Sequence, residues 1–396
     1  MRIIVCEIKK IWSIKTLAII AVLSALYFTL ISGYLSSYPR GYPRGIWFWD
    51  VDFGHHLTEN YGATLEQDDF DDFFESYFDI IYHEINSFIE SRPIFFEAGI
   101  FDIWGYWDTR DFVWTHYDTL SEREINLWYA VYSEMESSLP NRRMQNFFDL
   151  INMYEHRWVA DINYFIEHTP VSDREAQRLR EIRDSGEMLS IMPSYTMFLT
   201  STYGRYLSVL VILVTLILNS PIITTDRANR VNWLQYSSKQ GRHILKKQFI
   251  AILISAIGMT TIILAVFSWI FSSTETYVFW NNGINSFLNF PYYWLPITYG
   301  QYVLLIVGII YLLSIGTAAF AFVLSRLSHS MIRLIFKIIP FFIMTMLLSN
   351  WILDQFLAIY LGGDVLMQML SILFLLIVGT TLATLVTRRE KRVELE

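Results

Sequence analysis

Six long apolar runs restrict the fold of this chain more than any other feature. The first covers residues 16–34 and the other five follow the middle of the chain, at 199–225, 248–272, 294–325, 334–353 and 365–387. A bilayer core of about 30 Å takes roughly 20 helical residues. Since lipid offers no partner for backbone polar groups, each run must pair its own by forming a helix. The sequence therefore predicts an all-α membrane protein with six transmembrane helices.

Residues 35–196 differ from the rest of the chain in charge. They carry 30 Asp/Glu against 12 Arg, with no Lys and no Cys, which gives a formal charge of −18 within a total of −8. Aromatic and aliphatic residues recur there every three or four positions between the acids, as in the stretch from Phe70 to Ile89. Ser121 with Glu124, and Ser172 with Glu175, have the spacing of capping boxes. We expect a mainly helical, water-soluble domain, with a looser aromatic segment at 93–117.

The distribution of Lys and Arg predicts the orientation in the membrane. Seventeen of these residues fall near the N-terminus, in the loop 225–247, between the fifth and sixth runs of the list of segments around 326–337, and in the tail 388–396. The short loops 273–293 and 354–364 have none. Because positive residues are retained on the cytoplasmic side, we expect a multi-pass plasma-membrane protein with both termini in the cytosol and residues 35–196 outside.

Residues 1–15 form an amphipathic segment before the first apolar run at 16–34. Ile3, Ile4, Ile8, Ile11 and Trp12 alternate with Arg2, Glu7, Lys9, Lys10 and Lys15 at helical spacing. Such a helix is expected to lie in the membrane surface as an elbow, with contacts from Ile4, Ile8, Lys9, Lys10 and Trp12. A cleaved signal sequence was the alternative, but the apolar run is longer than a signal core and no small-residue cleavage site follows it.

The cytoplasmic loop 225–247 carries more than a connection needs. It has six Lys/Arg against a single acid, Asp226, and it offers apolar and aromatic surface at Val231, Trp233, Leu234 and Tyr236. This composition predicts a short helix that docks on a partner. The bland alternative is that its basic residues only fix the orientation of the spans.

Motifs for catalysis are missing from the sequence. There is no G-x-x-x-x-G-K-[ST], and His83-Glu84 is followed by Ser87 where a zinc motif needs His. A G-x-S-x-G nucleophile motif is also missing. The spans contain few ionisable residues, Arg205 and Lys337 among them. We expect a non-catalytic membrane subunit with no metal or cofactor of its own, so that any ATP is bound and hydrolysed by another chain.

Together these features resemble the membrane permease subunit of a type-2 ABC exporter. The resemblance lies in the elbow, the six spans and a first cytoplasmic loop with Asp226-Arg227, a short helix, Ser237, Gly241-Arg242 and Lys246-Lys247. The family often has Glu in place of Asp226 and Gly-Thr in place of Arg230-Val231. The resemblance implies that this loop is a coupling helix seated in an ATPase subunit. The implied contact residues are Asp226, Arg227, Arg230, Trp233, Leu234 and Tyr236.

The family assembles two permease chains, identical or homologous, with two ATPase chains in the lipid bilayer, and no nucleic acid is involved. The implied function is export of an amphipathic substrate, whether peptide, lipid or drug. An alternative is an ABC-type sensor or mechanotransmitter whose extracellular domain binds a peptide or cell-wall partner without net transport. An intramembrane enzyme is a third reading, disfavoured because the spans lack His, Asp or Cys in convergent positions.

Overall fold

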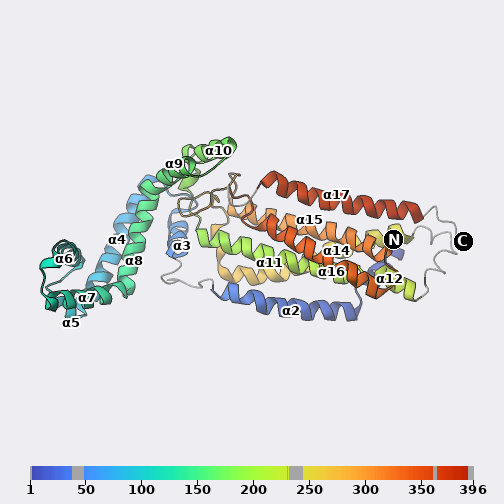
Figure 1. Cartoon of the computed structure of the whole chain (residues 1–396), viewed down its shortest axis with the longest axis horizontal. Helices are drawn as coiled ribbons and strands as arrows, with labels where there is room; N and C mark the ends of the chain where they lie inside the picture. Colours follow the sequence, from blue (N-terminus) through green and yellow to red (C-terminus); the bar gives the residue numbers. More distant parts are fainter. Residues whose placement is uncertain (1, 38–48, 230, 232–243, 360–363, 391–396) are drawn as a thin grey trace. The chain divides into compact units, whose positions relative to one another are not determined.

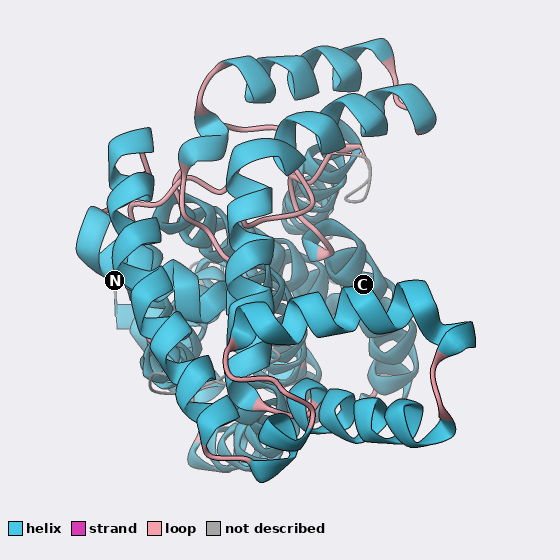
Figure 2. Ribbon diagram, turned by 90° about the vertical axis from the view of Figure 1, so that its left-hand side faces the viewer, coloured by secondary structure: helices cyan, strands magenta, loops and turns pink. Residues whose placement is uncertain are grey.

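The computed structural model describes residues 2–37, 49–229, 231, 244–359 and 364–390, with the side chains of 32–37, 156–161 and 390 outside that description. Within those residues every regular element is a helix, as the cyan ribbons of Figure 2 show. The chain divides into two compact units. The first, here called the span unit, comprises residues 1–40, 196–277 and 293–396, and the second, the insert unit, comprises 41–195 and 278–292.

The span unit contains six helices that are long and apolar enough to cross a membrane, which confirms the prediction of an all-α, multi-pass membrane protein. They are α2 (Ile14–Ser37), α11 (Ser194–Asn219) with its continuation α12 (Pro221–Ala228), α14 (Ile244–Phe271), α15 (Tyr299–Arg326), α16 (Met331–Leu353) and α17 (Val365–Glu390). A short helix, α1 (Arg2–Ile11), precedes them. Figure 1 shows these six long helices running lengthwise beside one another.

Helix α11 is the centre of the span unit. Of its most apolar window 78% is buried, against 11% for α2. A helix that is apolar all round is expected in such an interior position. Its hydroxyls bond to neighbouring helices: Tyr203 donates to the carbonyl of Phe267 in α14 at 2.6 Å, and Thr215 shares a 3.1 Å bond with Ser314 of α15. Ser314 also accepts from Thr260 of α14 at 2.8 Å, so one buried hydroxyl layer joins three helices.

Helices α15 and α17 pack closely because glycines lie where they cross. A Cβ added to Gly316 would lie 2.9 Å from Cγ of Leu375, and one added to Gly379 would lie 3.0 Å from the ring of Phe320. Small residues of this kind let helix backbones approach in a membrane, where dispersion contacts replace the hydrophobic effect as the source of association.

The fourth span starts later than its apolar run does. Thr298 caps α15 in a capping box with Gln301, and Pro296 precedes the helix. The residues before this cap pair with the segment after α16: the N–H of Trp294 donates to the carbonyl of Leu357 at 2.9 Å. The extra length of the run is thus an ordered connection outside the helix.

The insert unit is built around two long antiparallel helices, α4 (Gln67–Glu90) and α8 (Leu139–Asn152), which lie side by side in Figure 1. The remaining helices are α3 (Trp49–Tyr61), α5 (Pro93–Glu97), α6 (Ile103–His116), α7 (Glu122–Glu136), α9 (Trp158–His168) and α10 (Asp173–Asp184). A π-helical segment, Met153–Arg157, joins α8 to α9. Both predicted capping boxes are present, at the start of α7 and of α10.

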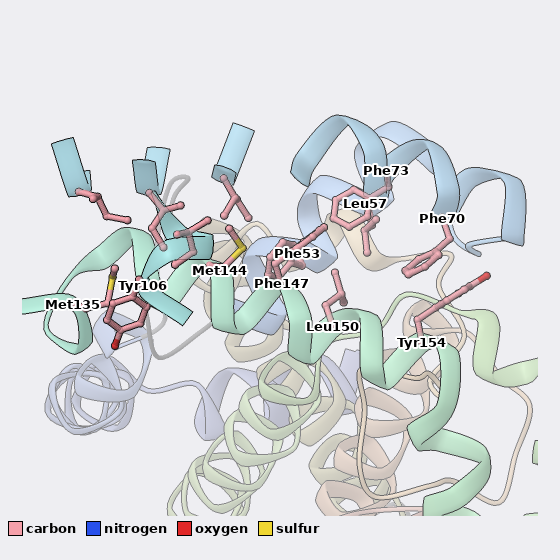
Figure 3. Close-up of a cluster of buried hydrophobic side chains, with 14 of the residues drawn as sticks. Phe53, Leu57, Phe70, Phe73, Tyr106, Met135, Met144, Phe147, Leu150 and Tyr154 are labelled. Atoms are coloured by element: carbon pink, nitrogen blue, oxygen red, sulfur yellow. The ribbon is translucent and has the colours of Figure 1, made fainter. Parts of the chain in front are cut away.

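An aromatic cluster fills the core of the insert unit (Figure 3). The ring of Phe147, from α8, lies within 5.7 to 6.4 Å of the ring centroids of Phe53, Phe73, Phe74 and Tyr77 on α3 and α4. Phe73 and Phe147 are fully buried. The three-and-four spacing of the α4 aromatics thus places them on one face, as the sequence predicted, and the acids between them remain on the other.

One part of the insert differs from the prediction. Residues 93–117, expected to be a looser segment, form α5 and α6. Pro93 occupies the first turn of α5, where its missing N–H costs nothing, and the side chain of Asp102 caps α6 by accepting from the N–H of Gly105 at 2.7 Å. Local start signals therefore outweigh the dense aromatic composition.

A second, distant stretch of chain completes the insert unit. Residues 278–292, which follow the third span, belong to it. Phe287 and Leu288 join its buried core. The hydroxyl of Ser286 accepts from the N–H of Met192 at 2.9 Å and donates to the carbonyl of Ser190 at 2.6 Å. The sequence analysis had treated this stretch only as part of a short loop between spans.

Candidate functional site

A buried polar group joins three helices at the end of the span unit that carries the predicted docking loop. It consists of Glu7 and Lys10 from α1, Asp226 from α12 and Gln248 from α14. Lys10 Nζ lies 2.9 Å from Glu7 Oε1 and 3.4 Å from Asp226 Oδ1. Gln248 Nε2 donates to Asp226 Oδ2 at 2.8 Å and to Glu7 Oε2 at 3.2 Å. We call these four residues the junction.

Burial makes the junction contacts consequential. Glu7 is 3% exposed, Asp226 5% and Gln248 2%. Carboxylates in such positions need partners, since removing one partner of a buried ion pair costs about 3–5 kcal/mol. Burial lowers the pKa of Lys10, but the hydrogen bond and charge of Glu7, together with Asp226, outweigh it and leave the pKa of Lys10 above its ordinary value. Lys10 therefore remains a cation across the physiological range.

Arg227 extends these connections to the fourth span. Its guanidinium donates to the backbone carbonyls of Ser328 and Arg326, at 2.6 and 2.9 Å. Lys337 Nζ reaches the neighbouring carbonyl of Leu327 at 2.8 Å. The last carbonyls of a helix have no partner within it and favour cations. The end of α15 is thus held by one cation from α12 and one from α16.

Helix α12 also contacts the fifth span directly. The hydroxyl of Thr224 lies 3.3 Å from the sulfur of Met331, the first residue of α16. Through Asp226, Arg227 and Thr224, the short helix α12 is therefore tied to α1, α14, α15 and α16. A displacement of α12 reaches all four of them, which is the mechanical property that a coupling segment needs.

The predicted contact residues divide into two sets. Asp226 and Arg227 are described, and both make the contacts within the chain that are given above. Arg230, Trp233, Leu234 and Tyr236 lie outside the described residues. The assignment of all six as contacts of an ATPase subunit stays a prediction.

The predicted elbow residues lie on α1, which is helical as expected. Ile4 and Ile8 are half-buried, Lys9 is exposed, and Lys10 belongs to the junction. Trp12 lies against Gly258 of α14, where a Cβ would be 3.5 Å from its ring. Helix α1 packs on α14, and its location in a membrane surface stays a prediction.

Sequence reasoning missed Glu7 and Gln248. It placed Glu7 with the charged residues of the amphipathic segment, whereas the structure buries it. The signal was present: Glu7 follows Ile3 by four positions and precedes Ile11 by four, so it falls inside the apolar stripe of the helix. A carboxylate in that position requires a buried partner. Nothing in the sequence marks Gln248 as that partner, 241 residues away.

The span unit also contains an ion pair that was only half foreseen. Arg205 on α11, expected near an outer end, lies 2.7 Å from Asp354, the residue that follows α16. Among the described residues no three or more His, Cys, Asp or Glu side chains gather in a way that could hold a metal ion. The geometry of the site is therefore that of a load-bearing junction. Comparison of the chain with protein-family models, with curated proteins and with solved structures gave no match.

Proposed function

We propose that this chain is the permease subunit of an ATP-binding cassette exporter. In this proposal it moves an amphipathic substrate across the plasma membrane, and separate ATPase subunits bind and hydrolyse ATP. The observation that carries the proposal is the attachment of α12, the helix leading into loop 225–247, to α1, α14, α15 and α16. A partner that pushes on this loop would move these helices together.

The composition of the insert unit supports the topology that the proposal needs. Tyr195 and Val278 belong to one compact unit. Between them the chain passes through α11 and α14, each long and apolar enough to cross a membrane. A chain that leaves one side and returns to it must cross twice, so the loop between α12 and α14 lies on the side opposite to the insert unit. The Lys/Arg count then assigns that loop to the cytosol.

The first test concerns the loop itself. We expect the double variant Arg230→Ala, Trp233→Ala to lose co-purification with a P-loop ATPase and ATP-dependent transport in vesicles. Arg and Trp are the residue types that most often dominate interface energy. The matched control, Lys391→Ala with Arg392→Ala in the tail, should keep both properties. If the loop variant also kept both, the coupling assignment would be wrong.

The second test separates attachment from transmission. We expect Asp226→Ala to retain the ATPase subunit but to reduce the transport obtained per ATP hydrolysed, because the loop surface remains while its tie to α1 and α14 is cut. The tail variant is again the control. Unchanged coupling in Asp226→Ala, measured as transport and hydrolysis on the same vesicles, would show that the junction has only a structural role.

The third test addresses sidedness. In a Cys6→Ser background, Ser238→Cys should resist a membrane-impermeant maleimide in intact cells, and it should react once the cells are opened. Thr115→Cys, exposed on α6, should react in intact cells. The reverse pattern would overturn the proposed orientation and the function built on it.

A further inference from the structure

The insert unit has a surface of exposed aromatic side chains at one end of the α4–α8 pair. The end is formed by α5, α6 and α7, as Figure 1 shows. Its exposed aromatics are Phe96, Phe101, Trp104, Phe112, Trp114 and Tyr129. Phe101 is 62% exposed and Trp114 60%. Isolated exposed apolar residues are ordinary, but a cluster of this size in a domain that otherwise buries its rings marks an interaction surface. We call it the aromatic end.

Ring contacts show that the cluster is continuous along α5 and α6. Phe96 and Phe101 lie 5.6 Å apart between ring centroids, and Trp104 lies 5.1 Å from Trp107. Trp107 in turn packs against Phe148 of α8 at 5.8 Å. The rings are therefore held in place by their neighbours, so that binding to them costs little side-chain entropy.

Carboxylates lie among these rings. On α6, Trp104, Asp108, Asp111 and Phe112 follow one another at three- and four-residue spacing, so they share the outward face. Asp111 is paired with Arg110 at 3.0 Å, whereas the exposed Asp108 has no such neighbour among the printed contacts of the described residues. Residues 93–136 hold nine Asp/Glu and two Arg, a formal charge of −7. The face is apolar and anionic together.

This charge decides between possible occupants. A second copy of the aromatic end would bring −7 against −7, and like charges across an interface are unfavourable. The anionic surface of a bilayer would be repelled in the same way. A peptide with basic and apolar side chains meets both demands, because its cations can pair with carboxylates and lie over aromatic faces while its apolar residues cover the rings.

We propose that the aromatic end of the insert unit, centred on Trp104, Asp108 and Phe112, binds a cationic amphipathic peptide. The proposal goes beyond the permease function and does not need it, since the surface would bind without an ATPase. The peptide's basic residues engage the outward carboxylates of α6, and its apolar residues engage the rings of α5 and α6.

Binding of synthetic peptides to the full-length protein tests the proposal. The protein is placed in nanodiscs of zwitterionic lipid, with empty nanodiscs as the blank, and a fluorescent helical peptide of Lys, Leu and Trp is titrated in. Two matched peptides carry Glu for every Lys, or Ser for every Leu and Trp. We expect saturable binding of the first alone, weakened by salt as screening predicts. Equal binding of the Glu peptide would overturn the charge argument.

Paired variants locate the surface. Trp104→Gln with Phe112→Gln, and separately Asp108→Asn with Asp111→Asn, should each weaken binding about tenfold, the scale of a lost pair of interface anchors. The controls change the same chemistry elsewhere on the insert: Tyr164→Gln, an aromatic that is 65% exposed on α9, and Glu75→Gln with Asp79→Asn on α4. Controls should bind like the parent. Circular dichroism and thermal unfolding show that each variant is folded.

Three results would reject the assignment. The first is undiminished binding in both paired variants, and the second is an equal loss in the controls. The third is a different occupant: association of the protein with itself, or with anionic vesicles, that disappears in the Trp104→Gln, Phe112→Gln variant while peptide binding persists. Because none of these measurements involves ATP or a partner ATPase, failure here and failure of the permease proposal are distinguishable.

Discussion

The insert unit and the span unit are both all-helical, yet they are built in opposite senses. The insert unit buries rings such as Phe73 and Phe147 and turns carboxylates outward. The span unit turns Phe336 and Phe374 outward, at 73% and 68% exposed, and buries the hydroxyl of Ser314 among its helices. The difference shows that the medium around each helix decides its pattern: water rewards buried rings, whereas hydrocarbon is as apolar as the side chains and leaves packing and hydrogen bonds to hold helices together.

The largest expected effect follows from the core of the insert unit. Phe147→Ala removes a fully buried ring that contacts four others, and truncations of this kind cost about 3–5 kcal/mol through lost burial and a cavity. We expect protease sensitivity within residues 49–190 at a temperature where the parent resists. Phe148→Ala, next in sequence but 37% exposed, is the control and should cost much less. Equal sensitivity of the two variants would contradict a ring-centred core.

The corresponding change in the span unit adds volume where two helices meet. Gly316→Ala places a Cβ 2.9 Å from Cγ of Leu375, and overpacking of this type costs about 1–3 kcal/mol. Thermal unfolding in detergent should show a lower midpoint for Gly316→Ala. Gly308→Ala, on the same helix with nothing within 4 Å of its added Cβ, should match the parent or exceed it. A neutral Gly316→Ala would mean that α15 and α17 do not need their close approach.

Helix capping gives a smaller effect that belongs to the water-soluble unit. Ser121→Ala removes the cap of α7 and should cost about 1 kcal/mol. Ser133→Ala, exposed within the same helix, is the control and should change the free energy of unfolding little. Denaturant unfolding of the full chain measures both. No difference between them would show that the capping box does not contribute to stability.

Acid should remove part of the same cap. Hydrogen bonds from the side chain and backbone N–H of Ser121 lower the pKa of Glu124 below its ordinary value. The stability from the ionised Glu124 is therefore fully present above its unfolded-state pKa of about 4.3 and is lost as pH falls through the lower folded-state pKa. We expect Glu124→Gln to destabilise at neutral pH and to approach the parent in strong acid, by circular dichroism. A difference that grew in acid would reverse the sign.

The smallest effect concerns the hydroxyl layer of the span unit. Ser314→Ala removes the shared partner of Thr215 and Thr260, and such interhelical bonds average about 0.6 kcal/mol in a membrane. Ser371→Ala is the control, because that hydroxyl is exposed and bonds only to the carbonyl of Met367 in its own helix. Unfolding in mixed micelles compares the two variants. A loss in Ser314→Ala as large as that in Phe147→Ala would contradict the ranking of forces in the two units.

Local patterns in the sequence predicted much of both units. Apolar runs longer than a bilayer core predicted six spans, and the spacing of Phe70, Phe73 and Ile85 predicted α4 and its buried face. Ser121 and Ser172 with their partners three positions on predicted the starts of α7 and α10. These features depend on neighbours within one or two turns, which a sequence displays directly.

Features that depend on distant segments could not be predicted in this way. The pairing of Glu7 with Gln248, and of Arg205 with Asp354, is set by how helices pack, and no local pattern names the partner. Residues 278–292 give no sign in the sequence that they complete a domain begun more than 200 residues earlier. Asp102, in contrast, was a visible helix start that the dense aromatic composition around it obscured.

The two-part construction of the insert unit has a consequence for biogenesis. Phe287 and Leu288 join its core, and Ser286 bonds to the backbone near Met192, so a nascent chain that has emerged only as far as α11 lacks part of that interior. Two more hydrophobic helices must leave the ribosome and enter the bilayer before the missing piece is delivered. The domain can thus close only after insertion of the third helix succeeds, and its maturation reports that the membrane topology is correct.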